Sequence, residues 1–173
     1  MTKQLRTSLK LAFAAAAVAF APAAFSANTN ASSTGTVIAP IAIIKAADLA
    51  FGSFIAVTGG SVTVSPNGAR SVTGAVVAAG GTPAAAKFDV TGEAGATYTI
   101  SVVGDTNLTS GANNMAFTVI SDLTASASTS GTVATGTLTA GAQSIFVGGT
   151  LTVASAQAAG TYTGNIVATV EYN

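Results

Sequence analysis

The chain has 173 residues, of which 7% are charged and 49% hydrophobic, and its formal net charge is zero. This length suggests one domain once a targeting segment is removed. Disordered chains are poor in hydrophobic residues and rich in charge, so the composition excludes disorder for the body of the protein. Its many small and β-branched residues favour strands and tight turns over solvated helices.

The N-terminus has the pattern of a secretory signal peptide. Three basic residues lie within residues 3–10, and an uninterrupted apolar run covers residues 11–20. Ala24 and Ser26 occupy the −3 and −1 positions of a cleavage site. The apolar run is too short for a permanent anchor, so a membrane tether is the less favoured alternative. We therefore predict a signal peptide at residues 1–26. It would export the protein through the periplasm to the cell surface or the extracellular medium.

The predicted mature chain is mildly acidic and lacks cysteine. It keeps three basic and six acidic residues, a net charge of about −3. Without a basic patch, nucleic acid is a poor candidate partner. An exported chain without disulfides must be held by packing and by ladder hydrogen bonds, which a chain of this size can achieve.

Alternating apolar residues predict strands along most of the mature chain. Residues 27–35 are small and polar, which predicts a flexible lead-in. The apolar run at residues 37–44 contains Pro40, which favours an edge or terminal strand. Alternation or β-branching predicts further strands at residues 49–57, 61–65, 70–78, 87–91, 97–103, 115–120, 132–139, 143–146, 150–153 and 162–172. Residues 107–114 are a predicted loop, and residues 121–130 are polar and predicted to be exposed.

Glycine marks several predicted turns. Asn67-Gly68 follows an alternating run, which predicts a two-residue hairpin turn with positive φ at both positions. The Gly-Gly pairs beginning at Gly59, Gly80 and Gly148 are also predicted turns between strands. About nine or ten short antiparallel strands with no helical period and no internal repeat indicate an all-β sandwich.

The residue inventory argues against catalysis. The chain has no His, Cys or Trp, which excludes imidazole and thiolate metal sites and triads with a His base. Its acidic residues are scattered singly, and no pair is singled out for glycoside hydrolysis. We therefore predict no enzyme activity, no cofactor, no metal and no small-molecule substrate, which leaves binding or structure as the function.

The end of the chain resembles the last strand of chaperone–usher pilins. Gly160 is fourteenth from the end, Tyr172 is next to last, and apolar residues alternate between them. An ordinary terminal strand of a sandwich is the alternative, since alternation is expected there too. The resemblance implies that this strand contacts a chaperone or a neighbouring subunit through Gly160, Tyr162, Ile166, Ala168, Val170 and Tyr172.

The rest of the mature chain resembles the DUF4402 family of secreted bacterial domains, which is related to spore-coat-U-like and archaic pilins. The matching stretches are residues 40–43, 48–52, 64–68, 91–98, 147–151 and 159–162. Together they span essentially the whole mature chain. The resemblance implies one immunoglobulin-like β-sandwich of pilin type over residues 36–173.

A pilin-like fold implies a structural subunit of a bacterial surface fibre. Such a sandwich lacks its final strand, which the N-terminal segment of a neighbour supplies after a periplasmic chaperone and an outer-membrane usher have handled the subunit. The implied partners are other copies of the chain or related pilins, and a host or surface receptor. Residues 36–44 are the candidate donor strand, with Val37, Ala39, Ile41 and Ile43 on one face. They could equally form the domain's own first strand.

Two other functions compete with the fibre subunit. A self-complete sandwich could act as a monomeric adhesin or carbohydrate-binding module, which exposed aromatic side chains would support. A hydrolase on a β-sandwich is the third possibility, and the residue inventory argues against it.

Overall fold

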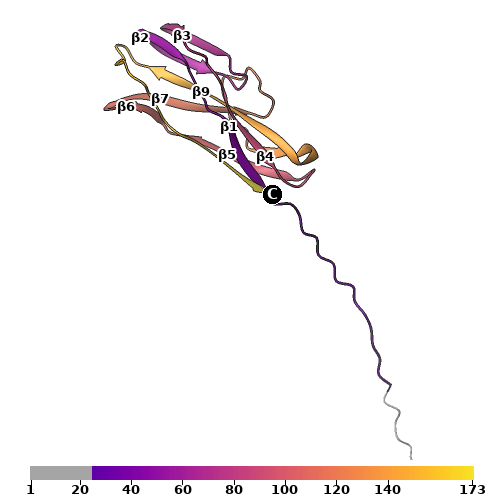
Figure 1. The fold of residues 1–173 in the computed structure, drawn as a ribbon. Helices are drawn as coiled ribbons and strands as arrows, with labels where there is room; N and C mark the ends of the chain where they lie inside the picture. The colour runs from indigo at the N-terminus through magenta and orange to yellow at the C-terminus, as the bar shows by residue number, and fades with distance from the viewer. Residues whose placement is uncertain (1–24) are drawn as a thin grey trace, which may run out of the picture. The chain divides into compact units, whose positions relative to one another are not determined.

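Ten β-strands carry the secondary structure in the computed structural model, which describes residues 25–173 (Figure 1). No helix among these residues is long and apolar enough to cross a membrane. A single 3₁₀ turn, η1 (Thr139–Gly141), precedes β9. The strands are β1 (Ala42–Ala47), β2 (Ser53–Val64), β3 (Arg70–Gly80), β4 (Ala86–Thr91), β5 (Thr97–Gly104), β6 (Asn107–Ser110), β7 (Asn113–Asp122), β8 (Thr135–Thr137), β9 (Ala142–Val153) and β10 (Ile166–Tyr172). The predicted all-β class is confirmed.

The described chain divides into two units. Residues 25–36 have no regular structure, and all of them are exposed. Residues 37–173 form the second unit, which contains all ten strands. Of the predicted signal peptide, residues 1–24 lie outside the described part of the chain.

The strands form two antiparallel sheets, which confirms the predicted sandwich. Strand β9 is the centre of the larger sheet. Along one edge it pairs with β4 through its first half and with β2 through its second half, while β7 follows its other edge. Strands β1, β3 and β6 extend this sheet from β4, β2 and β7. The smaller sheet has the order β10-β5-β8, so β1 and β10 are both edge strands.

The core consists of two adjacent clusters of buried side chains. In the first cluster, Tyr98, Ile100 and Val102 of β5 point inward and pack with Val90 and Val147 of the larger sheet. The Tyr98 hydroxyl donates to Gln143 Oε1 at 2.9 Å, and burial raises its pKa. The second cluster comprises Val62, Val76, Met115, Phe117, Leu151 and Val153. The first cluster holds the two sheets together by apolar burial, whereas the buried members of the second cluster all come from the larger sheet.

Two of the three Gly-Gly pairs that predicted turns lie inside strands instead. Gly59-Gly60 forms an irregularity in the ladder between β2 and β3, and Gly148-Gly149 lies within β9. A Cβ atom on Gly148 would overlap the carbonyl oxygen of Val64. Glycine is needed at this position because the neighbouring backbone approaches too closely for a side chain. The predicted turns at these two pairs are therefore wrong.

The hairpin between β2 and β3 closes through three residues rather than two. Gly68 N–H donates to Ser65 O at 2.8 Å, and Ser65 N–H donates to Ala69 O at 3.0 Å. Gly68 has a φ of +84°, whereas Asn67 is not in the positive-φ region. The predicted two-residue turn is wrong because Pro66 begins the turn and Gly68 supplies the left-handed residue that follows it.

Residues 107–114, predicted as a loop, form a second hairpin. Strands β6 and β7 pair from Asn107 opposite Ala116 to Ser110 opposite Asn113. Gly111 takes a φ of +59° in the turn between them. This hairpin contains few apolar residues, so its sequence lacks the alternation that would predict strand pairing.

The close approach at Gly148 predicts a steric effect on stability. The φ of Gly148 is not in the left-handed region, so an added methyl group acts through overlap with the backbone of Val64 and Ser65 and not through backbone strain. We expect Gly148→Ala to lower the free energy of unfolding by about 1–3 kcal/mol, as overpacking does. Gly35→Ala is the matched control, because its Cβ would meet nothing within 4 Å. Equal urea midpoints for the two variants would contradict this account.

Candidate functional site: an open groove beside the last strand

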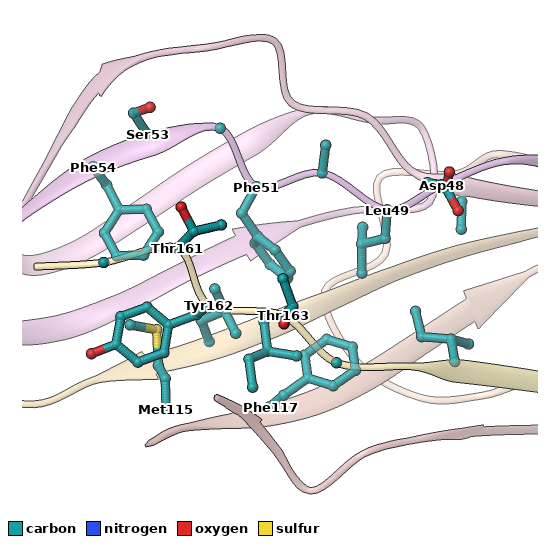
Figure 2. A pocket seen from close by; sticks show the side chains of 18 of the residues that line it. Asp48, Leu49, Phe51, Ser53, Phe54, Met115, Phe117, Thr161, Tyr162 and Thr163 are labelled. Atoms are coloured by element: carbon teal, nitrogen blue, oxygen red, sulfur yellow. The ribbon is translucent and has the colours of Figure 1, made fainter. Parts of the chain in front are cut away.

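A groove of about 880 Å³ lies on the side of the domain where the chain enters β2 and β10 (Figure 2). One wall is the connection from β1 into β2, and the other is the connection that leads into β10. Buried side chains of β7 and β9 form the floor. The lining consists of residues 45, 47–56, 86, 88, 108, 115, 117, 151 and 157–166.

Aromatic side chains from both walls meet above an apolar floor. Phe51 precedes β2 and Phe54 lies at its start, and both extend from one wall, while Tyr162 extends from the wall before β10 (Figure 2). The rings of Phe51 and Phe117 are in edge-to-face contact, with centroids 6.1 Å apart and planes at 87°. The Phe117 ring also occupies the space that a side chain on Gly149 would need. The groove is therefore apolar at its base and shaped by close packing.

The wall before β2 is held by one guanidinium group. Arg70 Nη1 donates to the carbonyl oxygens of Phe51 at 2.9 Å, Ser53 at 3.1 Å and Gly80 at 3.1 Å. Nη1 carries two hydrogens, so two of the three carbonyl oxygens share one of them. These charge-assisted bonds fix the backbone that carries Phe51. On the same wall, Lys45 Nζ and Asp48 Oδ1 form an exposed ion pair at 2.6 Å.

The wall before β10 is held by the hydroxyl of Tyr162. This hydroxyl donates to Ala158 O at 2.8 Å and accepts from Gln157 Nε2 at 2.7 Å. Gln157 Nε2 also donates to Asn114 O at 3.0 Å, which ties the segment to β7. The polar end of Tyr162 is thus satisfied within the chain, and its ring is left to line the groove.

Beyond this wall, β10 is hydrogen-bonded along one edge only. Thr163 and Thr109 exchange backbone hydrogen bonds, and Asn173 N–H donates to Thr97 O at 3.2 Å. The odd-numbered residues from Thr163 to Asn173 therefore direct their N–H and C=O groups toward β5 and β6. Backbone groups alternate in direction along an antiparallel strand. The N–H and C=O groups of Ile166, Ala168 and Val170 therefore point to the other edge. No strand among the described residues pairs with that edge.

At the far end of β10, Tyr172 and Glu93 hold one residue of the N-terminal segment. The Tyr172 hydroxyl donates to Ala39 O at 2.9 Å and accepts from Glu93 N–H at 2.6 Å. Glu93 Oε2 accepts from Ala39 N–H at 3.1 Å. Gly92 leaves room for this hydroxyl, since a Cβ there would overlap it. We call Ala39, Glu93 and Tyr172 the Ala39 clasp.

All six residues predicted for subunit or chaperone interaction lie along this side of the domain. Gly160, Tyr162 and Ile166 line the groove. Ala168, Val170 and Tyr172 continue along β10, where they pack half-buried against the first cluster. Gly160 does not have the left-handed backbone of a sharp turn; a side chain there would collide with Ser110.

The four candidate donor residues divide into two groups. Val37 is 98% exposed, and Ala39 is exposed apart from its two clasp bonds. Ile41 and Ile43 instead pack against the first core cluster of their own domain. Residues 42–47 pair with β4 of their own domain as strand β1 and do not pair with β10.

Two carboxylates with lowered pKa values serve other parts of the domain. A hydrogen bond from Ser144 and the charge of Lys87 lower the pKa of Asp89. Bonds from the Ser126 hydroxyl and from backbone amides lower the pKa of Asp122. Neither residue lines the groove. Within residues 25–173, no group of three or more His, Cys, Asp or Glu residues could hold a metal ion.

The comparison with known families decides which family the chain represents. The model of the domain of unknown function DUF4402 matches residues 41–172, most of the chain. The chain belongs to the DUF4402 family. Neither a curated protein sequence nor a solved structure matched it. The DUF4402 match covers β1 to β10 and therefore includes the whole groove.

Several groove residues of this DUF4402 domain were not predicted as site residues. Phe51 and Phe54 were recognised only as members of a strand, and Met115 and Phe117 only as part of another. Glu93 lies in the family-matching stretch 91–98, but nothing in that stretch indicates its contact with Ala39, which is 54 residues away in the chain. Pairings this distant depend on how the sheets stack, which local patterns do not specify.

The Ala39 clasp predicts that the Tyr172 hydroxyl contributes to stability. Tyr172→Phe would leave Glu93 N–H and Ala39 O without this partner, so we expect a loss of about 1–2 kcal/mol in the free energy of unfolding. Glu171→Gln is the control, since its side chain is exposed and substitutions at such sites usually change stability by less than about 0.5 kcal/mol. Indistinguishable urea denaturation curves for both variants would show that the clasp does not form.

Proposed function

We propose that this DUF4402 domain is a structural subunit of a bacterial surface fibre, in which a strand from a neighbouring copy completes the sandwich. The observation that carries the proposal is the unpaired edge of β10, which begins at an open groove with an apolar floor. An exposed sheet edge is a template for strand addition, and side-chain pockets beside it select the added strand. An immunoglobulin-like sandwich of pilin type is the fold that this function implies.

The energetics require the groove as well as the edge. Ile166, Ala168 and Val170 offer three N–H donors and three C=O acceptors, each worth about 1 kcal/mol net when paired. Ordering the backbone of each added residue costs about 1–2 kcal/mol, so these bonds alone would not retain a strand. Burial of apolar side chains against Phe51, Phe54 and Tyr162 would supply the rest, at about 25 cal/mol per Å².

The open edge also supports the proposed partners. An unpaired edge next to half-buried apolar side chains is prone to non-specific pairing. A periplasmic chaperone that covers β10 during transit, and an outer-membrane usher that exchanges it for the next subunit, would prevent this. The proposal therefore includes export by the signal peptide at residues 1–26 and a final location at the cell surface.

The groove also supports a second candidate, a monomeric adhesin or carbohydrate-binding module. Phe51, Phe54 and Tyr162 line it together with polar groups such as Asp48. The support is weaker, because the Tyr162 hydroxyl already has two partners within the chain and is not free to bind a sugar. The unpaired backbone of β10 has no role in that alternative.

A proline at Ala168 tests the fibre proposal. The Ala168 N–H points to the open edge, so Ala168→Pro removes no bond to β5, and edge strands tolerate proline in this orientation. We expect a folded monomer but no polymers, because the added strand loses a hydrogen bond and meets the proline ring. Size-exclusion chromatography and electron microscopy of surface material would measure assembly.

Thr169→Pro is the matched control for this experiment. The Thr169 N–H bonds to β5, so its removal should destabilise the monomer itself. Wild-type protein that stays monomeric at the cell surface, or Ala168→Pro protein that polymerises normally, would contradict the fibre proposal.

A further inference from the structure

We infer that the free edge of β3 is a contact surface for a second copy of this chain, with the two β3 strands paired antiparallel about a twofold axis within residues 75–79. Strand β3 lies in the larger sheet and β10 in the smaller one, so this contact goes beyond the fibre proposal and does not rest on it. Between fibres, it would join neighbours side by side.

One edge of β3 has no partner. The strand ends the larger sheet and pairs only with β2. Among the described residues, no other backbone hydrogen bond reaches residues 71–80. The ladder with β2 shifts register between Ala56 and Gly60, beyond which residues 76–80 pair with residues 53–56. An exposed row of N–H and C=O groups is a template for a further strand.

The β3 edge lacks the features that protect the other edges of the domain. Edge strands are commonly protected from pairing by short length, by charged residues or by proline. Strands β6 and β8 have only 4 and 3 residues, β1 carries Lys45, and β10 carries Glu171. Strand β3 has 11 residues, and residues 71–80 include neither a charged residue nor a proline. The guanidinium of Arg70, at its start, bonds to carbonyl groups of its own chain.

The start of β2 and the end of β3 form a two-stranded ribbon that is apolar on both faces. Phe54 and Ala56 pack inward against the second cluster. Ile55 and Val57 alternate with them and point outward, and Val77 lies directly opposite Ile55. These three outward side chains are 54%, 55% and 53% exposed. Apolar residues on both faces of a strand are typical of a sheet that is covered on both sides. A single copy leaves the outward face uncovered.

A second copy fits this edge in both charge and backbone. Residues 27–173 include three basic and six acidic residues, so most contacts between two copies bring like charges together. Residues 53–58 and 75–80 contain no charged residue, so two ribbons can meet without this repulsion. Each copy also supplies the unpaired backbone row that the other lacks. Antiparallel pairing of a strand with its own copy is self-complementary, as a twofold interface requires.

A lipid surface is the other partner that an apolar ribbon could meet. Helices that lie on membranes combine their apolar side chains with Lys or Arg, and often with Trp or Phe. The outward face of the ribbon offers Ile55, Val57 and Val77 without a basic or an aromatic residue. The ribbon therefore fits a second copy better than a lipid surface.

Single cysteines test the contact directly, because the chain has no cysteine of its own. Ala75→Cys, Val77→Cys and Ala79→Cys each place one thiol on the edge segment, and a residue close to a twofold axis faces its counterpart at a separation that disulfides span. Thr135→Cys is the control, since Thr135 is exposed on the edge strand β8. All four are made in the Ala168→Pro background, which blocks the β10 edge. On non-reducing gels, we expect at least tenfold more linked dimer from the best β3 variant than from the control, and equal yields would overturn the inference.

A charge on the ribbon provides a second test, because lysine on an edge strand opposes pairing. Val77→Lys is compared with Val103→Lys, whose side chain is 60% exposed on β5. In the Ala168→Pro background, we expect unchanged urea midpoints for both and, by sedimentation velocity, at least tenfold weaker dimerisation for Val77→Lys alone.

Three results of this comparison would overturn the inference. They are equal association of the two lysine variants, a parent domain that stays monomeric up to its solubility limit, and binding of the monomer to phosphatidylcholine vesicles that Val77→Lys abolishes. Each of them leaves the fibre proposal standing, because that proposal depends on the β10 edge.

Discussion

Strand β10 has two rows of backbone hydrogen-bonding groups, and its own chain satisfies only one of them. The row on odd-numbered residues bonds to β5, while the row on Ile166, Ala168 and Val170 faces an edge with no partner among the described residues. Unpaired backbone groups beside an apolar groove are unfavourable unless water or another strand pairs with them. The groove beside the start of β10 acquires its role in relation to this row.

The rest of the sandwich holds that edge in a fixed position. Tyr98, Ile100 and Val102 anchor β5 in the first cluster, and β5 in turn carries β10. Phe117 and Leu151 hold the groove floor, with glycine at the places where neighbouring atoms approach most closely. The site is therefore a property of how the sheets stack and not of a single motif.

Much of this architecture could be predicted from alternation alone. The apolar residues at every second position of residues 97–103 and 162–172 predict the strands β5 and β10, and in the structure these residues face the core. The turns predicted at Gly59-Gly60 and Gly148-Gly149 were wrong, because glycine is as typical of a close backbone approach inside a strand as of a turn. At Gly148, only the structure shows which applies, since the backbone of Val64 lies against it. The Ala39 clasp could not be predicted, since it joins residues from three distant parts of the chain.

Amide hydrogen exchange along β10 tests the central claim most directly. In the isolated domain, the account predicts fast exchange at Ile166, Ala168 and Val170 and slow exchange at Val167, Thr169 and Glu171. In assembled material, the three fast amides should become protected, since a strand from a second copy then pairs with them. Equal protection of both rows in the isolated domain would contradict the account, as would three fast amides that stay fast after assembly.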